Sequence, residues 1–201
     1  MRSFAVLLFA GLSAFGQPIH PFTVTEISRH AGVANQSATE SRFLFAMNRD
    51  GSIVSVDLDP SSGSTRQIID VVKHRSVLVT PNSRSAVFSR YYGPAPQFGS
   101  PEACEQRFKN VRDAAISVDK SAGEIQGMEL QRISIGVPTG LTTEIFVAPS
   151  LSCHIMKAQT FRNGILLESQ TSEDLRLGDP DPRLFEVPAD YRLTDATFSR
   201  K

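Results

Sequence analysis

The chain has 201 residues, 21 lysines and arginines against 21 aspartates and glutamates, and only two cysteines. Its length suits one domain with a real hydrophobic core. The balanced charge and the lack of a lysine and arginine run argue against nucleic acid or an anionic membrane surface as a partner. After residue 16 no apolar segment approaches the length of a transmembrane span.

Residues 1–16 have the three parts of a secretory signal peptide. Arg2 supplies the positive charge, and Phe4–Leu12 is an apolar run too short to span a bilayer. Ala14-Phe15-Gly16 then places small residues at the two positions that a signal peptidase reads. A buried N-terminal strand is the alternative interpretation. We predict that residues 1–16 are removed and that residues 17–201 form one exported domain, either periplasmic or secreted.

Strands are predicted along the whole N-terminal part of the chain, because apolar residues alternate or form short dense runs. Asp50-Gly51 separates two of these runs as a hairpin turn, since glycine provides the positive φ that a tight turn needs. Acids at 57 and 59 faintly resemble a calcium-binding loop, but Ile68 stands where that loop needs glutamate, so a plain turn is favoured. The predicted strands cover 22–29, 42–47, 53–58, 66–72, 76–80 and 85–89.

Residues 91–101 interrupt this pattern with prolines, glycines and two tyrosines, which predicts an exposed loop. Tyr91, Tyr92 and Phe98 are its candidate partner-contact residues, because exposed aromatic side chains on such loops often bind other proteins. The alternative is that they fold back to cover an open sheet edge.

One short helix is predicted over Ser100–Val111. Ser100 suits the N-cap and Pro101 the first helical position, while Cys104, Phe108 and Val111 recur at helical spacing. The chain then returns to strands. In one unbroken strand Met128 and Leu130 would lie on one face and Ile133 on the other, so a bulge or break is expected near Gln131-Arg132. The later predicted strands cover 115–119, 127–137, 141–147, 154–161 and 165–177, with an Asn-Gly hairpin turn at 163–164.

A rigid connector follows the last long strand. Residues 178–182 have the sequence Gly-Asp-Pro-Asp-Pro, and its two prolines are incompatible with a helix. Leu184, Phe185, Val187 and Tyr191 are expected to dock after it and to lock the edge of the C-terminal strands.

The two cysteines, Cys104 and Cys153, are predicted to form a disulfide, since an exported chain with an even pair meets an oxidising compartment. Two free thiols or a metal site are the alternatives. Neither cysteine belongs to a CxxC motif, and only His154 lies near one of them, so the metal site has little support.

Three motifs together resemble a known group of proteins. They are RDGS (49–52), EIFVAPSLSC (144–153) and GDPDPRLFEVPADY (178–191). The combination resembles a group of exported bacterial proteins of unknown function that is distantly similar to the LolA/LolB lipoprotein-carrier superfamily. The resemblance spans about Arg42 to Arg192.

The resemblance implies a fold class: a mainly β protein, α+β at most, with a curled antiparallel sheet that forms a half-open β-barrel with one short helix. Its concave face would be apolar, and its convex face would meet water. The resemblance also implies that Cys104 pairs with Cys153 and that no catalytic residue is carried over. Lipoprotein carriers close their half-barrel with several helices, whereas this chain offers one.

No catalytic, cofactor-binding or metal-binding residue is predicted. The histidines at 20, 30, 74 and 154 are isolated, and the HExxH, GxSxG, Walker and GxGxxG patterns are absent. Asp57 with Asp59 and Asp179 with Asp181 lie beside prolines in predicted turns, where turn chemistry explains them. Lys73-His74-Arg75 is expected to be a solvated hairpin turn.

Three functions of different classes follow, in this order. The first is a non-enzymatic exported β-scaffold that binds an apolar ligand, a lipid or a lipoprotein segment in its concave face. The second is a protein–protein interaction module of the cell envelope, which offers sheet edges or the loop around Tyr91. The third is an enzyme whose dispersed residues meet only in space.

Overall fold

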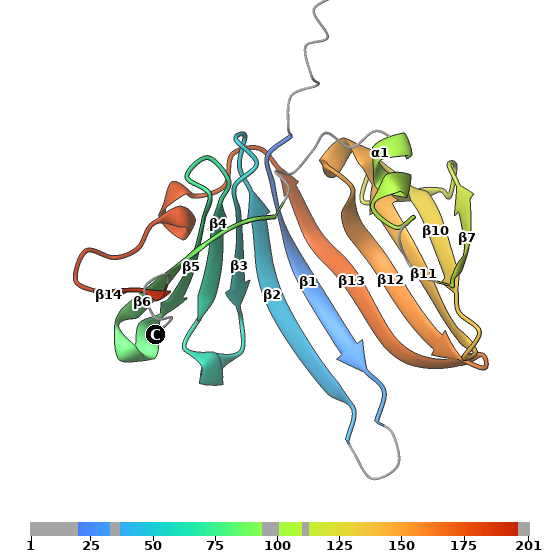
Figure 1. Cartoon of the computed structure of the whole chain (residues 1–201), viewed down its shortest axis with the longest axis horizontal. Helices are drawn as coiled ribbons and strands as arrows, with labels where there is room; N and C mark the ends of the chain where they lie inside the picture. The colour runs from blue at the N-terminus through green and yellow to red at the C-terminus, as the bar shows by residue number, and fades with distance from the viewer. Residues whose placement is uncertain (1–19, 33–36, 94–100, 110–112, 197–201) are drawn as a thin grey trace, which may run out of the picture.

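The computed structural model describes residues 20–32, 37–93, 101–109 and 113–196. One sheet of twelve strands dominates it, in the order β14-β6-β5-β4-β3-β2-β1-β13-β12-β11-β10-β7 (Figure 1). The edge strands β14 and β7 do not pair with each other, so the curled sheet stays open among the described residues. The predicted fold class, a mainly β half-open barrel with one short helix, is confirmed.

Most strand bounds agree closely with the predicted ones, whereas the strands at Glu124–Ile125 and Arg192–Asp195 were not predicted. The strands of the large sheet are Phe22–His30 (β1), Thr39–Met47 (β2), Ile53–Asp57 (β3), Arg66–Asp70 (β4), Arg75–Thr80 (β5), Ser85–Arg90 (β6), Ala115–Asp119 (β7), Gln131–Gly136 (β10), Leu141–Ala148 (β11), His154–Arg162 (β12), Ile165–Leu177 (β13) and Arg192–Asp195 (β14). A separate hairpin is formed by Glu124–Ile125 (β8) and Met128–Glu129 (β9). The 3-10 turns are Pro60–Ser62 (η1), Pro81–Ser83 (η2), Pro149–Leu151 (η3) and Pro182–Phe185 (η4).

Two meanders meet at the middle of the sheet. Strands β1 to β6 each pair with the next one along the chain, and β7, β10, β11, β12 and β13 do the same in the other half. Strand β1 pairs antiparallel with β13, which joins the halves. Strand β14 is the exception, because it pairs in parallel with β6 at the far edge.

One face of the sheet carries the helix, and we call it the helix face. The registers place Ile133, Ile145, Ala158, Gln170 and Ser28 across from one another on this face, because directly paired residues share a face. Helix α1, Pro101–Gln106, covers it at one end of the sheet (Figure 1).

The predicted disulfide is confirmed and fastens the helix to the sheet. Cys104 of α1 is bonded to Cys153, with the two Cα atoms 5.3 Å apart. Both cysteines are buried against Ile133, Ile145 and Val147. The helix ends at Gln106, earlier than predicted, although Phe108 in the following turn still packs on this cluster. Ser100 and Val111, the two predicted ends, lie outside the described residues.

The centre of the helix face is filled by an apolar group that we call the central cluster. The β8–β9 hairpin packs on it through Ile125 and Met128. Gln126 fixes the hairpin, since its amide donates to the carbonyl of Ser172 (2.7 Å) and its side-chain oxygen accepts from the backbone N–H of Leu175 (2.8 Å). The expected break in this region falls at Leu130, between β9 and β10. The buried members of the central cluster are Phe22, Val24, Met47, Leu130, Ala148, Leu151 and Met156.

The opposite face, which we call the tail face, is covered by the segment between β13 and β14. In Figure 1 this segment leaves the middle of the sheet and runs to the edge opposite α1. Its apolar side chains cover the row formed by Ala46, Val54, Ile68 and Val77, which the registers place side by side. The docking residues are the predicted ones, Leu184, Phe185, Val187 and Tyr191, but they cover the N-terminal half instead of the edge of the C-terminal strands.

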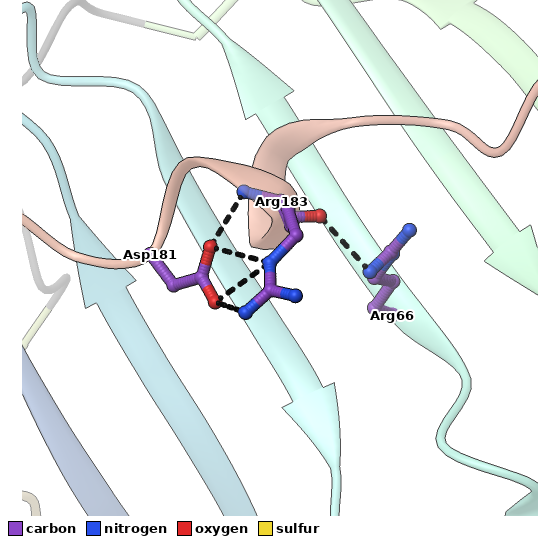
Figure 2. Close-up of polar contacts among 3 residues, drawn as sticks. All are labelled: Arg66, Asp181 and Arg183. Atoms are coloured by element: carbon purple, nitrogen blue, oxygen red, sulfur yellow. Dashed lines mark hydrogen bonds and ion pairs between the residues drawn. The ribbon is translucent and has the colours of Figure 1, made fainter.

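A small polar clamp holds this segment (Figure 2). The carboxylate of Asp181 accepts from the backbone N–H of Arg183 (3.0 Å) and from its guanidinium (2.6 Å). Arg66 of β4 donates to the backbone carbonyls of Arg183 and Glu186. Asp179, the other member of the predicted pair, binds the guanidinium of Arg49 through two hydrogen bonds of 2.7 and 2.8 Å. Asp179 therefore ties the segment to Arg49, whereas Asp181 caps the turn η4 within the segment.

No helix in the described part of the chain has both the length and the apolar character needed to cross a membrane.

Removing the disulfide should destabilise the protein strongly. Cys104 and Cys153 are 49 positions apart, and closing a loop of that length restricts the unfolded chain by roughly 4 kcal/mol at most. We expect the double variant Cys104→Ala/Cys153→Ala to lose about 2–4 kcal/mol in urea unfolding. Reductant should lower the midpoint of the wild type and leave the variant unchanged. An equal midpoint for both proteins without reductant would contradict this expectation.

The tail segment should contribute to stability through its apolar anchor. Phe185 is half-buried on the tail face, so Phe185→Ala should lower the free energy of unfolding by about 2 kcal/mol. Leu193→Ala is the control, because Leu193 on β14 is 59% exposed and such surface changes cost about 0.5 kcal/mol or less. Equal losses in the two variants, measured by urea denaturation, would rule out the anchoring role.

Candidate functional site

A polar pocket of about 300 Å³ opens on the helix face, and we call it the Glu26 pocket. Its apolar walls come from β2 and β3, and its polar groups come from β1, β12, β13 and the turn after α1. Segments distant in sequence thus meet there. The lining residues used below are Glu26, Phe45, Met47, Ile53, Tyr91, Arg107, His154 and Gln170.

His154 forms the buried floor of this pocket. Its ring packs against the rings of Phe22 and Phe45, at centroid distances of 4.9 and 4.8 Å, and those two rings stack on each other at 5.7 Å. The hydroxyl of Ser172 donates to the carbonyl of Ile155 (2.8 Å), so its oxygen accepts from Nε2 of His154 (3.2 Å). Burial lowers the pKa of His154 to about 4, so the imidazole is neutral at neutral pH.

Glu26 stands beside this histidine without a cationic partner in the described part of the chain. Its side chain is 20% exposed, and its Oε1 lies 3.8 Å from Nε2 of His154, beyond hydrogen-bonding distance. Burial raises the pKa of Glu26, because the charged carboxylate loses water. A neutral imidazole does not offset that loss.

Serine, histidine and glutamate do not form a catalytic relay here. Both Ser172 and Glu26 approach the same ring nitrogen, whereas a relay needs the serine on one nitrogen and the carboxylate on the other. Ser172 is also buried and gives its hydrogen to a backbone carbonyl. The arrangement therefore offers no activated nucleophile.

Arg107 completes the pocket from the turn after α1. Its guanidinium makes no hydrogen bond or ion pair with another described residue, and partial burial lowers its pKa. The Cys104–Cys153 disulfide fastens to the sheet the helix that precedes Arg107. A cationic group and an anionic group thus line the same small pocket.

The three aromatic residues predicted to contact a partner differ in their positions. Tyr91 is half-buried and lines the Glu26 pocket, with its backbone N–H bound to the carbonyl of His74 (2.9 Å). Tyr92 points outward and is 83% exposed. Phe98 lies outside the described residues. The role of these residues in partner binding stays a prediction.

A second and larger hollow of about 570 Å³ lies between the β8–β9 hairpin and η3, and we call it the hairpin hollow. Leu130 and Leu151 of the central cluster form part of its wall, and Met47 of the same cluster lines the Glu26 pocket. The two hollows therefore border one apolar cluster. At the rim, Nζ of Lys120 binds Glu102 at 2.9 Å.

Glu26 and Arg107 were not predicted as site residues from the sequence, and His154 had no predicted role. One local signal existed. Phe22, Val24 and Glu26 alternate along β1 and so lie on the same face, which puts a carboxylate on an otherwise apolar side of a strand. By contrast Asp59, one of the predicted turn acids, accepts from the backbone N–H of Ser61 (2.8 Å) as turn chemistry requires. Within the described residues, no three histidine, cysteine or acidic side chains gather as a metal site.

Comparison with known proteins finds the same fold in distant structures. No protein-family model and no curated protein matches the chain. An uncharacterized conserved protein from Thermus thermophilus is 9% identical over 87% of this chain and 90% of its own, with a TM-score of 0.54. The MucA/MucB complex of Pseudomonas aeruginosa contains a chain that is 12% identical over 86% of this chain, with a TM-score of 0.51.

These likenesses concern the fold alone. This chain spans 57% of the matched chain in the MucA/MucB complex, a little over half of it. A LolA-superfamily protein from Nitrosomonas europaea is 11% identical over 83% of this chain and 90% of its own, with a TM-score of 0.38. The LolA superfamily is the one that the sequence motifs resemble.

The buried His154 predicts a pH dependence of stability. Its folded pKa of about 4 lies below the ordinary value of 6.5, so the unfolded chain binds a proton that the folded chain does not bind. Stability should fall as the pH falls from about 6.5 towards 4, by up to roughly 3 kcal/mol. Glu26 acts in the opposite direction, because its raised pKa favours the protonated folded state.

Urea unfolding of Glu26→Gln from pH 7 to pH 4.5 isolates the histidine, since the opposing carboxyl is gone. In that background the additional change His154→Gln should remove most of the loss of stability on acidification. A loss of the same size in both proteins would contradict the role given to His154.

Proposed function

We propose that this protein is an exported, non-enzymatic binding protein that holds an apolar ligand, such as a lipid or a lipoprotein segment, on its helix face. The observation that carries the proposal is the pair of hollows, about 570 and 300 Å³, that border the same central cluster. The tail face has its apolar row covered by Leu184, Phe185, Val187 and Tyr191, whereas the helix face keeps space beside its apolar side chains.

The size and lining of the hollows support ligand binding. Protein interiors are close-packed and hold few voids larger than a water molecule, whereas ligand sites are concave, mostly apolar, and about 300–1,000 Å³ in volume. The hairpin hollow is lined by Met128, Leu130, Pro149, Leu151 and Leu177 on its apolar side. Leu177 is 60% exposed at this rim, and an apolar ligand would cover it.

Export is supported by the disulfide, because oxidising compartments maintain such bonds and the cytosol keeps thiols reduced. The signal peptide predicted over residues 1–16 lies outside the described residues and remains part of the proposal.

Protein–protein interaction is the second candidate function. Tyr92 is 83% exposed beside β6, and strand β7 pairs with β10 alone, so its other edge is open among the described strands. Open strand edges and exposed aromatic side chains are common contact points for partners. The MucA/MucB complex, whose matched chain shares this fold, is an assembly of two proteins.

Filling the hairpin hollow should abolish binding of an apolar ligand. Ser150 lines this hollow as the second residue of η3, so Ser150→Phe would place a ring inside it. We expect a loss of about tenfold or more in affinity for an environment-sensitive apolar fluorophore, because the ring occupies the space that the ligand needs.

Ser61→Phe is the matched control, because Ser61 is exposed and is the second residue of another proline-led 3-10 turn, η1. Native mass spectrometry of the purified proteins should find a co-purified apolar ligand on the wild type and on Ser61→Phe, and none on Ser150→Phe. Equal fluorophore binding by the two variants would place the ligand elsewhere or exclude it.

A further inference from the structure

We propose that the Glu26 pocket receives a zwitterionic head group, with a primary amine against Glu26 and a neighbouring phosphate or carboxylate against Arg107. The apolar part of the same ligand would then lie on the central cluster. This inference rests on the proposed function, because it assigns the head group of the ligand that the helix face holds.

The first argument is the unpaired carboxylate. Glu26 lies within a pocket, and its side chain is 20% exposed. Its carboxylate lies 3.8 Å from the neutral ring of His154 and forms no ion pair with a lysine or arginine of the described chain. A buried carboxylate without a cation is costly, because it has lost water and gained no opposite charge. A primary ammonium supplies the missing charge together with N–H donors.

The surroundings of Glu26 also suit an ammonium. Phe45 lines the same pocket, and the face of an aromatic ring attracts cations. Gln170 lines it as well and adds a neutral hydrogen-bonding amide.

The second argument is the unpaired guanidinium. Arg107 lines the pocket and forms no ion pair with a described residue, so its guanidinium is available to an anionic group in the pocket. A guanidinium presents a planar fork of donors that fits phosphate and carboxylate groups. The disulfide at Cys104 holds the helix that precedes Arg107, so the cation does not have to be ordered from a free loop when a ligand arrives.

The two charges together define the ligand class. An anionic head group would satisfy Arg107 and leave Glu26 unpaired, and a cationic one would do the reverse. A zwitterion satisfies both within a volume of about 300 Å³. Met47 and Ile53 line the pocket and pack with the central cluster, so the apolar part of an amphiphile has a continuous apolar surface beside the head group.

Two pairs of soluble amphiphiles test this chemistry. Lysophosphatidylethanolamine is compared with lysophosphatidylglycerol, which lacks the amine. Nε-palmitoyl-lysine, with an amine beside a carboxylate, is compared with palmitate. Affinities are measured by native mass spectrometry and fluorophore displacement on the full mature chain. The pair with the larger preference for its amine-bearing member identifies phosphate or carboxylate as the anionic group.

In at least one pair the wild type should prefer the amine-bearing member by about tenfold, the ratio that one favourable ion pair provides. Glu26→Gln should remove that preference, because it keeps the shape of the side chain and deletes its charge. Arg107→Gln should weaken binding of all four amphiphiles. The matched controls are Glu173→Gln and Arg176→Gln, two exposed residues of β13, with Glu173 paired to Thr25 of β1 beside the Glu26–Ser172 pair.

The outcomes separate the inference from the proposed function. Binding of all four amphiphiles with equal affinity, or a preference for the amine that survives in Glu26→Gln, overturns the zwitterion inference and leaves the binding protein in place. Failure of the wild type to bind any of the four overturns both. Thermal unfolding of each variant confirms that the fold is retained before affinities are compared.

Discussion

The pairing of β1 with β13 is the interaction on which the rest of the structure depends. It joins two meanders that would otherwise be separate sheets, and it gives β1 a partner on both sides. Its register also builds the site. Glu26 pairs with Ser172, and Ser172 binds His154 on the next strand, so a shift by one residue would move Glu26 to the tail face. Fold and candidate site therefore rest on the same set of backbone hydrogen bonds.

The two faces of this sheet are covered in different ways, and the difference underlies the functional proposal. A single extended segment packs on the apolar row of the tail face and is clamped by Arg66. On the helix face, α1 and the β8–β9 hairpin are fixed separately, one by the Cys104–Cys153 disulfide and the other by Gln126. Two small covers leave hollows beside them, and both hollows border the central cluster. The proposed binding of an apolar ligand rests on that incomplete filling.

Local pattern was sufficient to predict most of the strands and turns, whereas the curled, half-open sheet was implied by the family resemblance. The alternation of Val54 and Val56, the Asp50-Gly51 and Asn163-Gly164 turns, and the docking residues around Phe185 each follow from residues that are close in sequence. Which half of the sheet the tail covers could not be predicted, because that depends on strand order. The candidate site could not be predicted either, because it too depends on which strands become neighbours. Its side chains come from three distant segments, those of Glu26, Arg107 and His154. The one local signal was the position of Glu26 on β1, which alternation places on the same face as the apolar side chains of that strand.

The central claim is that one ligand occupies the helix face along the central cluster, and methionine methyl NMR tests it most directly. Met47 lines the Glu26 pocket and Met128 lines the hairpin hollow, so their methyl groups report on the two hollows separately. Titration of methyl-labelled protein with lysophosphatidylethanolamine should shift both signals together at one saturation midpoint. Unchanged Met47 and Met128 signals at saturating amphiphile would contradict the account.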